Sequence, residues 1–198
     1  MSPDTHGLRQ LIFLLWCVWA LYWVVSALRT KTTRRAEPVS SRLMHVLLLA
    51  AGGVLVAWQK LPWLTLRLWP DSLIACWIGV ALLIAGIAFA VWARTHLGAN
   101  WSGTVTVKEN HELIRSGPYA LVRHPIYTGL ISGVLGTAIA VGTLCAALGF
   151  LIIVIALKHK SRIEERFMTE AFGSDYQRYR AAVPALIPSI RPLRSAPR

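Results

Sequence analysis

Acidic residues are scarce in this chain of 198 residues, which has 9 aspartates and glutamates against 21 lysines and arginines. All charged residues together make up 15% of the sequence, while 55% is hydrophobic and the mean hydropathy is +0.51. So little charge excludes an ordinary soluble surface, and its clustering between long apolar runs is typical of a polytopic helical membrane protein. The lipid bilayer is therefore the first partner that the sequence predicts.

Cysteine is also rare. Cys17, Cys76 and Cys145 lie in three different apolar runs, without CxxC spacing and without a histidine at ligand distance. This pattern predicts neither a disulfide nor a metal site. Motifs for nucleic acid binding are missing as well, so the net charge of +12 favours basic loops that contact lipid head groups over a nucleic acid partner.

Five apolar runs approach the length of about 20 residues that a helix needs to cross a bilayer. They are residues 8–28, 43–58, 72–93, 125–141 and 143–157. Bulky basic residues after the first run argue against a cleaved signal peptide, so we expect that run to remain as a span. The last two runs are separated by little more than Gly142 and should form a tight antiparallel hairpin. The sequence thus predicts an all-α integral membrane protein with five transmembrane helices.

The lysines and arginines of the loops predict the orientation. Loop 29–42 carries five of them and loop 59–71 carries two, which places the first loop in the cytoplasm and the second outside. The same alternation places residues 94–124 and the segment from Lys158 onward on the cytoplasmic face. We therefore expect a multi-pass membrane protein with its N-terminus outside and its functional site facing the cytoplasm.

One polar segment interrupts the apolar sequence. LIRSGPYALVRHPIYTGL, residues 113–130, holds two arginines, a histidine, two tyrosines and two prolines. Pro125 suits the first turn of a helix, which puts Arg123, His124 and Tyr127 at the mouth of that helix. A basic helix N-terminus is suited to an anionic group. The alternative is that Arg123 contacts lipid head groups while Tyr127 belongs to an interfacial aromatic belt.

Two adjacent carboxylates, Glu164 and Glu165, follow the last apolar run at a matching depth. Carboxylates are poor anchors for an anionic membrane leaflet. They would suit a cationic ligand instead.

These elements together resemble a known family. RHPIYTG, preceded by SGPYALV and followed by IEERFMTEAFGSDYQRY and VPALIP, is similar to the isoprenylcysteine carboxyl methyltransferase family, whose wider group includes phospholipid N-methyltransferases. The resemblance runs from about residue 97 to residue 188, and the five-span layout resembles the short prokaryotic members. It implies S-adenosyl-L-methionine bound in a cytoplasmic pocket. No GxGxxG motif and no alternation of strands and helices occurs, which excludes the soluble type of methyltransferase fold.

The resemblance implies roles for individual residues. The cofactor pocket would comprise His111, Leu113, Gly117, Tyr119, Arg123, His124, Tyr127, Glu164 and Glu165, and of these Arg123, His124 and Glu165 would be catalytic. The acceptor would meet Asn100, Trp101 and Arg162, although Trp101 also suits an interfacial anchor. A carboxylate acceptor needs no general base, whereas a thiol or protonated amine would need one, from His124 or Glu165.

The resemblance also divides the chain. It implies an N-terminal three-span region, residues 1–93, and a catalytic region, residues 94–198. The catalytic region consists of a polar cytoplasmic segment, the helical hairpin 125–157 and a C-terminal cytoplasmic segment. The methyl acceptor should be lipophilic and arrive laterally from the bilayer, while the cofactor arrives from the cytosol.

Two other functions are each consistent with part of the sequence. A membrane NADPH-dependent reductase of the sterol type shares HPxYxG and a multi-span layout, but Glu165 would repel its polyanionic cofactor. A scaffold or lipid-binding membrane protein would use Arg123 as a head-group ligand and leave Glu164 and Glu165 as a solvated helix end.

Overall fold

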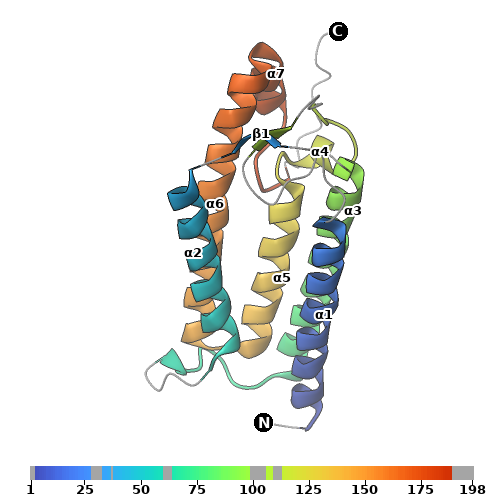
Figure 1. The fold of residues 1–198 in the computed structure, drawn as a ribbon. Helices are drawn as coiled ribbons and strands as arrows, with labels where there is room; N and C mark the ends of the chain where they lie inside the picture. Colours follow the sequence, from blue (N-terminus) through green and yellow to red (C-terminus); the bar gives the residue numbers. More distant parts are fainter. Residues whose placement is uncertain are drawn as a thin grey trace.

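A computed structural model describes residues 3–27, 33–36, 38–59, 64–98, 106–108 and 113–188. The long helices are α1 (Pro3–Ala27), α2 (Val39–Ala57), α3 (Leu73–Leu97), α5 (Pro125–Val141) and α6 (Leu144–Phe172) (Figure 1). Two short helices, α4 (Pro118–Leu121) and α7 (Ser174–Ala182), precede α5 and follow α6. Among these, α1, α2, α3 and α6 are long and apolar enough to cross a membrane, and α5 is a shorter apolar helix of 17 residues.

The bounds of α5 match the predicted run because both of its ends have strong local signals. Pro125 occupies the first turn, and Gly142 ends the helix in the left-handed region with φ 71°. The apolar run of α6 ends at Leu157 as predicted, but the helix continues to Phe172. Residues 158–172 are rich in lysine, arginine and glutamate, which favour helix, and no glycine or proline occurs before Gly173. The polar extension therefore carries Glu164 and Glu165 on a continuous helix.

A small antiparallel sheet departs from the predicted all-α fold. Strand β1 (Thr33–Ala36) pairs with β2 (Thr106–Lys108), with Arg35 opposite Val107. The residues of β2 are typical of a strand, but its partner β1 lies far away in the sequence. The sheet ties the two loops predicted to share one membrane face, and Figure 1 shows it at the same end of the bundle as α4 and α7.

Contacts at glycines bring four of the five long helices together in two pairs, α3 with α5 and α2 with α6. In the α3–α5 pair, a Cβ atom on Gly79 would lie 2.4 Å from the carbonyl oxygen of Gly136, and one on Gly86 would lie 2.4 Å from that of Gly129. The α2–α6 pair uses Gly52, where a Cβ atom would lie 2.9 Å from the carbonyl oxygen of Gly149. Small residues let helix backbones touch, and such packing is a main source of helix association within lipid.

The predicted hairpin is present, but its two helices take different main partners. Gly142 and Thr143 form the turn, and the Thr143 hydroxyl accepts a hydrogen bond from the backbone N–H of Ala146 at 3.2 Å, which caps α6. Beyond this turn, α5 packs mainly on α3, which α1 also contacts, and α6 packs mainly on α2. Helices from the expected regions 1–93 and 94–198 are therefore interleaved in space.

Candidate functional site

A buried ion pair lies where the start of α5 meets the polar part of α6. The Arg123 guanidinium donates to Oε1 of Glu165 through Nη2 at 2.6 Å and through Nε at 3.0 Å. The two side chains are only 9% and 10% exposed. The RHPIYTG element and the two glutamates, which are distant in sequence, thus meet as expected.

The remaining donors of Arg123 are also used within the protein. Its Nη1 donates to the backbone carbonyl of Arg180 at 3.0 Å and to that of Val183. Glu165 in turn faces a second cation, since Nε of Arg180 lies 3.5 Å from its Oε2 atom. The basic helix mouth predicted to receive an anion is therefore already neutralised by Glu165.

Residues 183–186, which we call the C-terminal strap, hydrogen-bond to the start of α5. The backbone N–H groups of Arg123 and His124 donate to the carbonyls of Pro184 and Ala185 at 2.9 and 3.0 Å. The Thr128 hydroxyl donates to the carbonyl of Leu186 at 2.6 Å. These bonds occupy N–H groups that the first residues of a helix leave free, and they give the VPALIP element a structural role.

His124 lies between the two carboxylates. Its Nε2 is 3.3 Å from Oε1 of Glu165, and its Nδ1 is 3.4 Å from Oε2 of Glu164. Its ring stacks on that of Tyr127, with centroids 5.6 Å apart and planes 4° from parallel, and the Tyr127 hydroxyl donates to Glu164. The ammonium group of Lys160 lies 5.7 Å from the centroid of the Tyr127 ring. His124 and Tyr127 thus lie together at the mouth of α5, as the position of Pro125 predicted.

The carboxylates also affect the protonation of His124, which immediately precedes α5. Burial alone would lower the pKa of the imidazole, but hydrogen bonds and charge interactions with Glu164 and Glu165 outweigh burial and raise that pKa above its ordinary value. The protonated imidazole is consequently the form that this site stabilises.

The raised pKa predicts how stability depends on pH. His124 should contribute fully below its unfolded pKa of about 6.5, and this contribution should disappear as the pH rises through the higher folded value. We expect the thermal midpoint in detergent to fall over this range more in the wild type than in His124→Gln. Thermal melts of both proteins between about pH 6 and pH 9 measure the difference. Parallel pH profiles for the two proteins would contradict the assignment.

Leu113, Gly117 and Tyr119 lie beside this cluster and build its frame. Leu113 packs against the buried group formed by Tyr176, Tyr179 and Val183. Gly117 has a φ of 58°, and a Cβ atom there would lie 2.9 Å from the His96 ring, so the position requires glycine. These residues brace α4 against α3 and α7.

Two tyrosines fasten α7 to this frame. The Tyr179 hydroxyl donates to the backbone carbonyl of Tyr119 at 2.6 Å. Burial raises the pKa of Tyr176 and of Tyr179 above the usual range, so both hydroxyls stay neutral.

Among the other predicted site residues, Arg162 has an exposed side chain on α6, and His111, Asn100 and Trp101 lie outside the described residues. Sequence reasoning missed Arg180 and Lys160. Arg180 follows Tyr176 by four residues, so helical periodicity places it on the face of α7 that packs on the site and could have identified it. His96 has a structural role, since its ring is hydrogen-bonded to the Ser116 hydroxyl at 2.9 Å.

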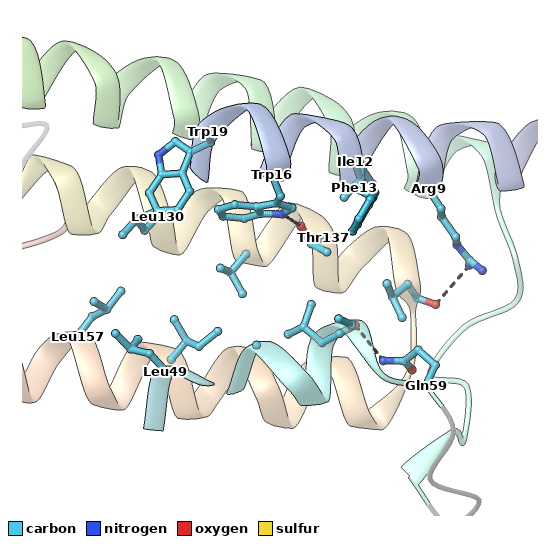
Figure 2. A pocket seen from close by; sticks show the side chains of 16 residues that line it. Arg9, Ile12, Phe13, Trp16, Trp19, Leu49, Gln59, Leu130, Thr137 and Leu157 are labelled. Carbon is cyan, nitrogen blue, oxygen red and sulfur yellow. Dashed lines mark hydrogen bonds between the residues drawn. The ribbon is translucent and has the colours of Figure 1, made fainter. Parts of the chain in front are cut away.

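An apolar cavity of about 670 Å³ adjoins the polar cluster between the two helix pairs. Figure 2 shows Leu130 and Leu157 near one end and Arg9 and Gln59 at the other. Leu130 follows Tyr127 by one helical turn, and Leu157 precedes Glu164 by two turns. The polar cluster and the cavity can therefore serve one molecule that has a charged reacting group and a hydrophobic portion.

Comparison with known proteins identifies relatives of this arrangement. The family model described as "Phospholipid methyltransferase" matches residues 74–175, just over half of the chain, from α3 to the start of α7. The chain is 36% identical over 101 residues to the protein-S-isoprenylcysteine O-methyltransferase of Schizosaccharomyces pombe, covering 50% of this chain and 43% of that protein. It is 31% identical to the cobalt-zinc-cadmium resistance protein CzcN of Cupriavidus metallidurans, covering 58% of this chain and 52% of that protein.

A solved structure has a similar fold. The eukaryotic intramembrane Ras methyltransferase ICMT superposes with a TM-score of 0.56 at 24% identity, covering 75% of this chain and 53% of that one. At this level of identity the likeness concerns the fold alone. The chain spans about half the length of the curated relatives it matches.

Proposed function

We propose that this chain, which belongs to the phospholipid methyltransferase family, is an integral membrane methyltransferase that uses S-adenosyl-L-methionine to methylate a lipophilic acceptor. Its activity would be most like that of the protein-S-isoprenylcysteine carboxyl O-methyltransferases. One observation carries the proposal: Arg123, His124 and Tyr127 meet Glu164 and Glu165 in a buried cluster beside an apolar cavity.

The residues present fit this cofactor. When bound, it would supply a methyl group on a cationic sulfonium, together with an ammonium, a carboxylate, a ribose and an adenine. Glu164 is 23% exposed, and its carboxylate is oriented by Tyr127 and His124, so it is available to a cation. Glu165, the neighbouring carboxylate, would fix the position of the Arg123 guanidinium through their ion pair. Tyr119 of α4 would bound the pocket together with Leu113 and Gly117, which precede that helix, and His111 would contribute to the same pocket. Asn100, Trp101 and Arg162 would lie toward the acceptor.

The remaining task of the protein would be to align the reactants and exclude water. Methyl transfer is an in-line displacement, and much of its acceleration can come from holding the reacting atoms in line. Both ring nitrogens of His124 face carboxylates, at 3.3 and 3.4 Å, so neither is directed at an acceptor from which it could take a proton. This supports an acceptor that is nucleophilic without losing a proton, such as a carboxylate, and therefore supports O-methylation.

The same proposal includes a membrane orientation. All five long helices would cross the bilayer, because the 17 residues of α5 give a helix of about 26 Å. The N-terminus would lie outside and the polar cluster in the cytoplasm of a prokaryotic cell, where lysines and arginines accumulate. Residues 94–198 would then carry the chemistry, and residues 1–93 would complete the walls around the acceptor.

Ligand binding and turnover test the proposed function. Detergent-solubilised protein should bind S-adenosylhomocysteine saturably in isothermal titration and should transfer a labelled methyl group to a prenylated thioacid. Phosphatidylethanolamine and a small thiol serve as competing acceptor classes. Failure of the folded protein to bind S-adenosylhomocysteine would contradict the proposal, and thermal stabilisation by NADPH instead would favour a reductase.

A further inference from the structure

The cavity has one end beside the polar cluster and an opposite end that includes two polar residues, Arg9 and Gln59. At the far end, Arg9 donates to the Ala140 carbonyl at 3.1 Å and pairs with Asp71 at 2.6 Å. Gln59 donates to the carbonyls of Leu55 and Val56 at 2.9 and 3.0 Å and accepts from the Thr143 hydroxyl at 2.6 Å. Each of the two side chains is thus held by its own hydrogen bonds, and we call this end the floor.

The near end is built differently. Leu130, Leu157 and Trp19 line it, and the buried Nε1–H of Trp19 meets no acceptor among the described residues. Phe13 of α1 and Ala57 of α2 also line the cavity and are both exposed, and they lie toward the far end, close in sequence to Arg9 and Gln59. The helices that carry them lie at opposite edges of the bundle (Figure 1). A hydrocarbon chain can therefore reach the cavity from the membrane, and a chain whose polar head lies beside Glu164 extends from the near end toward Trp16.

Trp16 lies midway along this cavity, between the two ends (Figure 2). Its Nε1–H donates to the Thr137 hydroxyl at 3.0 Å, and that hydroxyl donates to the Gly133 carbonyl at 2.9 Å. The indole packs edge-on against Trp19, with centroids 5.5 Å apart, and it lies 3.3 Å from where a Cβ atom on Gly133 would be. The ring is thus fixed by a hydrogen bond and by packing on two residues.

We infer that Trp16 sets the length of the hydrocarbon chain that the acceptor can place in this cavity. The distance along α5 from Leu130 to Thr137 is about 10 Å, whereas the distance from Leu130 to Val141 at the floor is about 16 Å. A chain whose polar head lies at the near end passes the indole before it reaches the floor. The inference rests on the proposed function, because it identifies the chain as the lipophilic part of the methyl acceptor.

The energetic argument gives a measurable length dependence. When affinity is referred to the free aqueous concentration of the ligand, each additional methylene held in an apolar site strengthens binding about fourfold. Affinity should rise by this factor per methylene until the chain reaches Trp16 and should then level off. Removing the indole should extend the rise toward the floor, and filling the cavity should end it earlier.

A homologous series of straight-chain 3-(alkylthio)propionates, which carry a free carboxylate, tests the inference by direct binding, without turnover. Displacement of a radiolabelled long member from protein in lipid nanodiscs gives the affinity of each chain length. Trp16→Ala should bind the longest members at least about tenfold more tightly than the wild type does, with unchanged affinity for the shortest.

The chain also offers a matched pair of filling variants. Gly53 lines the cavity and Gly7 does not, and a Cβ atom at either position meets nothing within 4 Å. Gly53→Leu should weaken the longest members at least about tenfold, whereas Gly7→Leu should bind like the wild type. Thermal melting establishes that each variant is folded.

Identical length profiles for the wild type and a folded Trp16→Ala would overturn the inference, as would equal losses in Gly53→Leu and Gly7→Leu. Failure of this inference is distinguishable from failure of the proposed function. Normal length profiles in a protein that does not bind S-adenosylhomocysteine would contradict the methyltransferase and leave the role of Trp16 intact. Binding of S-adenosylhomocysteine together with an alkylthiopropionate affinity that does not depend on chain length would contradict the role of Trp16 and leave the methyltransferase intact.

Discussion

Leucine in place of Gly86 is expected to lower the unfolding free energy by at least about 3 kcal/mol, which is a large fraction of the stability of most proteins. A Cβ atom at this position would lie 2.4 Å from the carbonyl oxygen of Gly129 and 2.8 Å from the backbone nitrogen of Gly133. Both are backbone atoms, so a rotamer change of a neighbour relieves neither contact. Helices α3 and α5 would have to separate, and denaturant titration in detergent measures the cost.

Gly53→Leu is the matched control for this experiment. It makes the same substitution within a long helix, and therefore the same gain in helix propensity, but at a position where a Cβ atom meets nothing within 4 Å. We expect its unfolding free energy to stay within about 1 kcal/mol of the wild type. Equal destabilisation by Gly86→Leu and Gly53→Leu would show that close backbone contact is not what holds α3 to α5.

Neutralising Glu165 should produce the second large effect. Glu165→Gln preserves size but leaves the guanidinium of Arg123 buried without its carboxylate, and breaking a buried pair in this way costs about 3–5 kcal/mol. The affinity for S-adenosyl-L-methionine should fall at least tens-fold, because Arg123 and the adjoining Glu164 lose their alignment or because Glu165 itself meets the cation. Thermal melting and isothermal titration separate the two losses.

A double mutant distinguishes the two roles of Glu165. Combining Glu165→Gln with Arg123→Gln removes both charges, so it should recover part of the stability that the single change loses. Cofactor affinity should remain low, since the alignment of the cluster is not rebuilt. A folded Glu165→Gln protein with wild-type affinity would remove Glu165 from the site, and a double mutant less stable than Glu165→Gln would show that the pair is not the source of the loss.

Local signals explain which parts of the fold were predictable. Pro125 and Gly142 bracket an apolar run, so α5 was predicted to the residue. The end of α6 at Phe172 was not predicted, because hydropathy indicates where a helix leaves the membrane and not where its backbone hydrogen bonds stop. The pairing of β1 with β2 and the choice of α3 as partner for α5 depend on contacts between distant segments, which hydropathy does not encode.

The site divides in the same way. A short motif fixed Arg123, His124 and Tyr127 around one helix start, and the matching depth of Glu164 and Glu165 predicted that the two groups would meet. What Arg123 binds was not predictable, because its partners include the Arg180 and Val183 carbonyls, and carbonyl acceptors are common to all residues. The cavity was equally invisible, since it arises from the space left between two helix pairs.

The glycine pairing has a consequence for how the protein is made. Translation delivers helices in chain order, yet among the described residues the glycine contacts of α2 are with α6, and those of α3 are with α5. Helices can insert individually and associate later, so α2 has to wait in the bilayer with Gly52 open to lipid while most of the chain is synthesised. The surface that later encloses the cavity is exposed throughout this interval. Assembly of this protein therefore depends on its last long helix, and a chain interrupted before α6 presents to quality control the same small-residue surface that holds the finished molecule together.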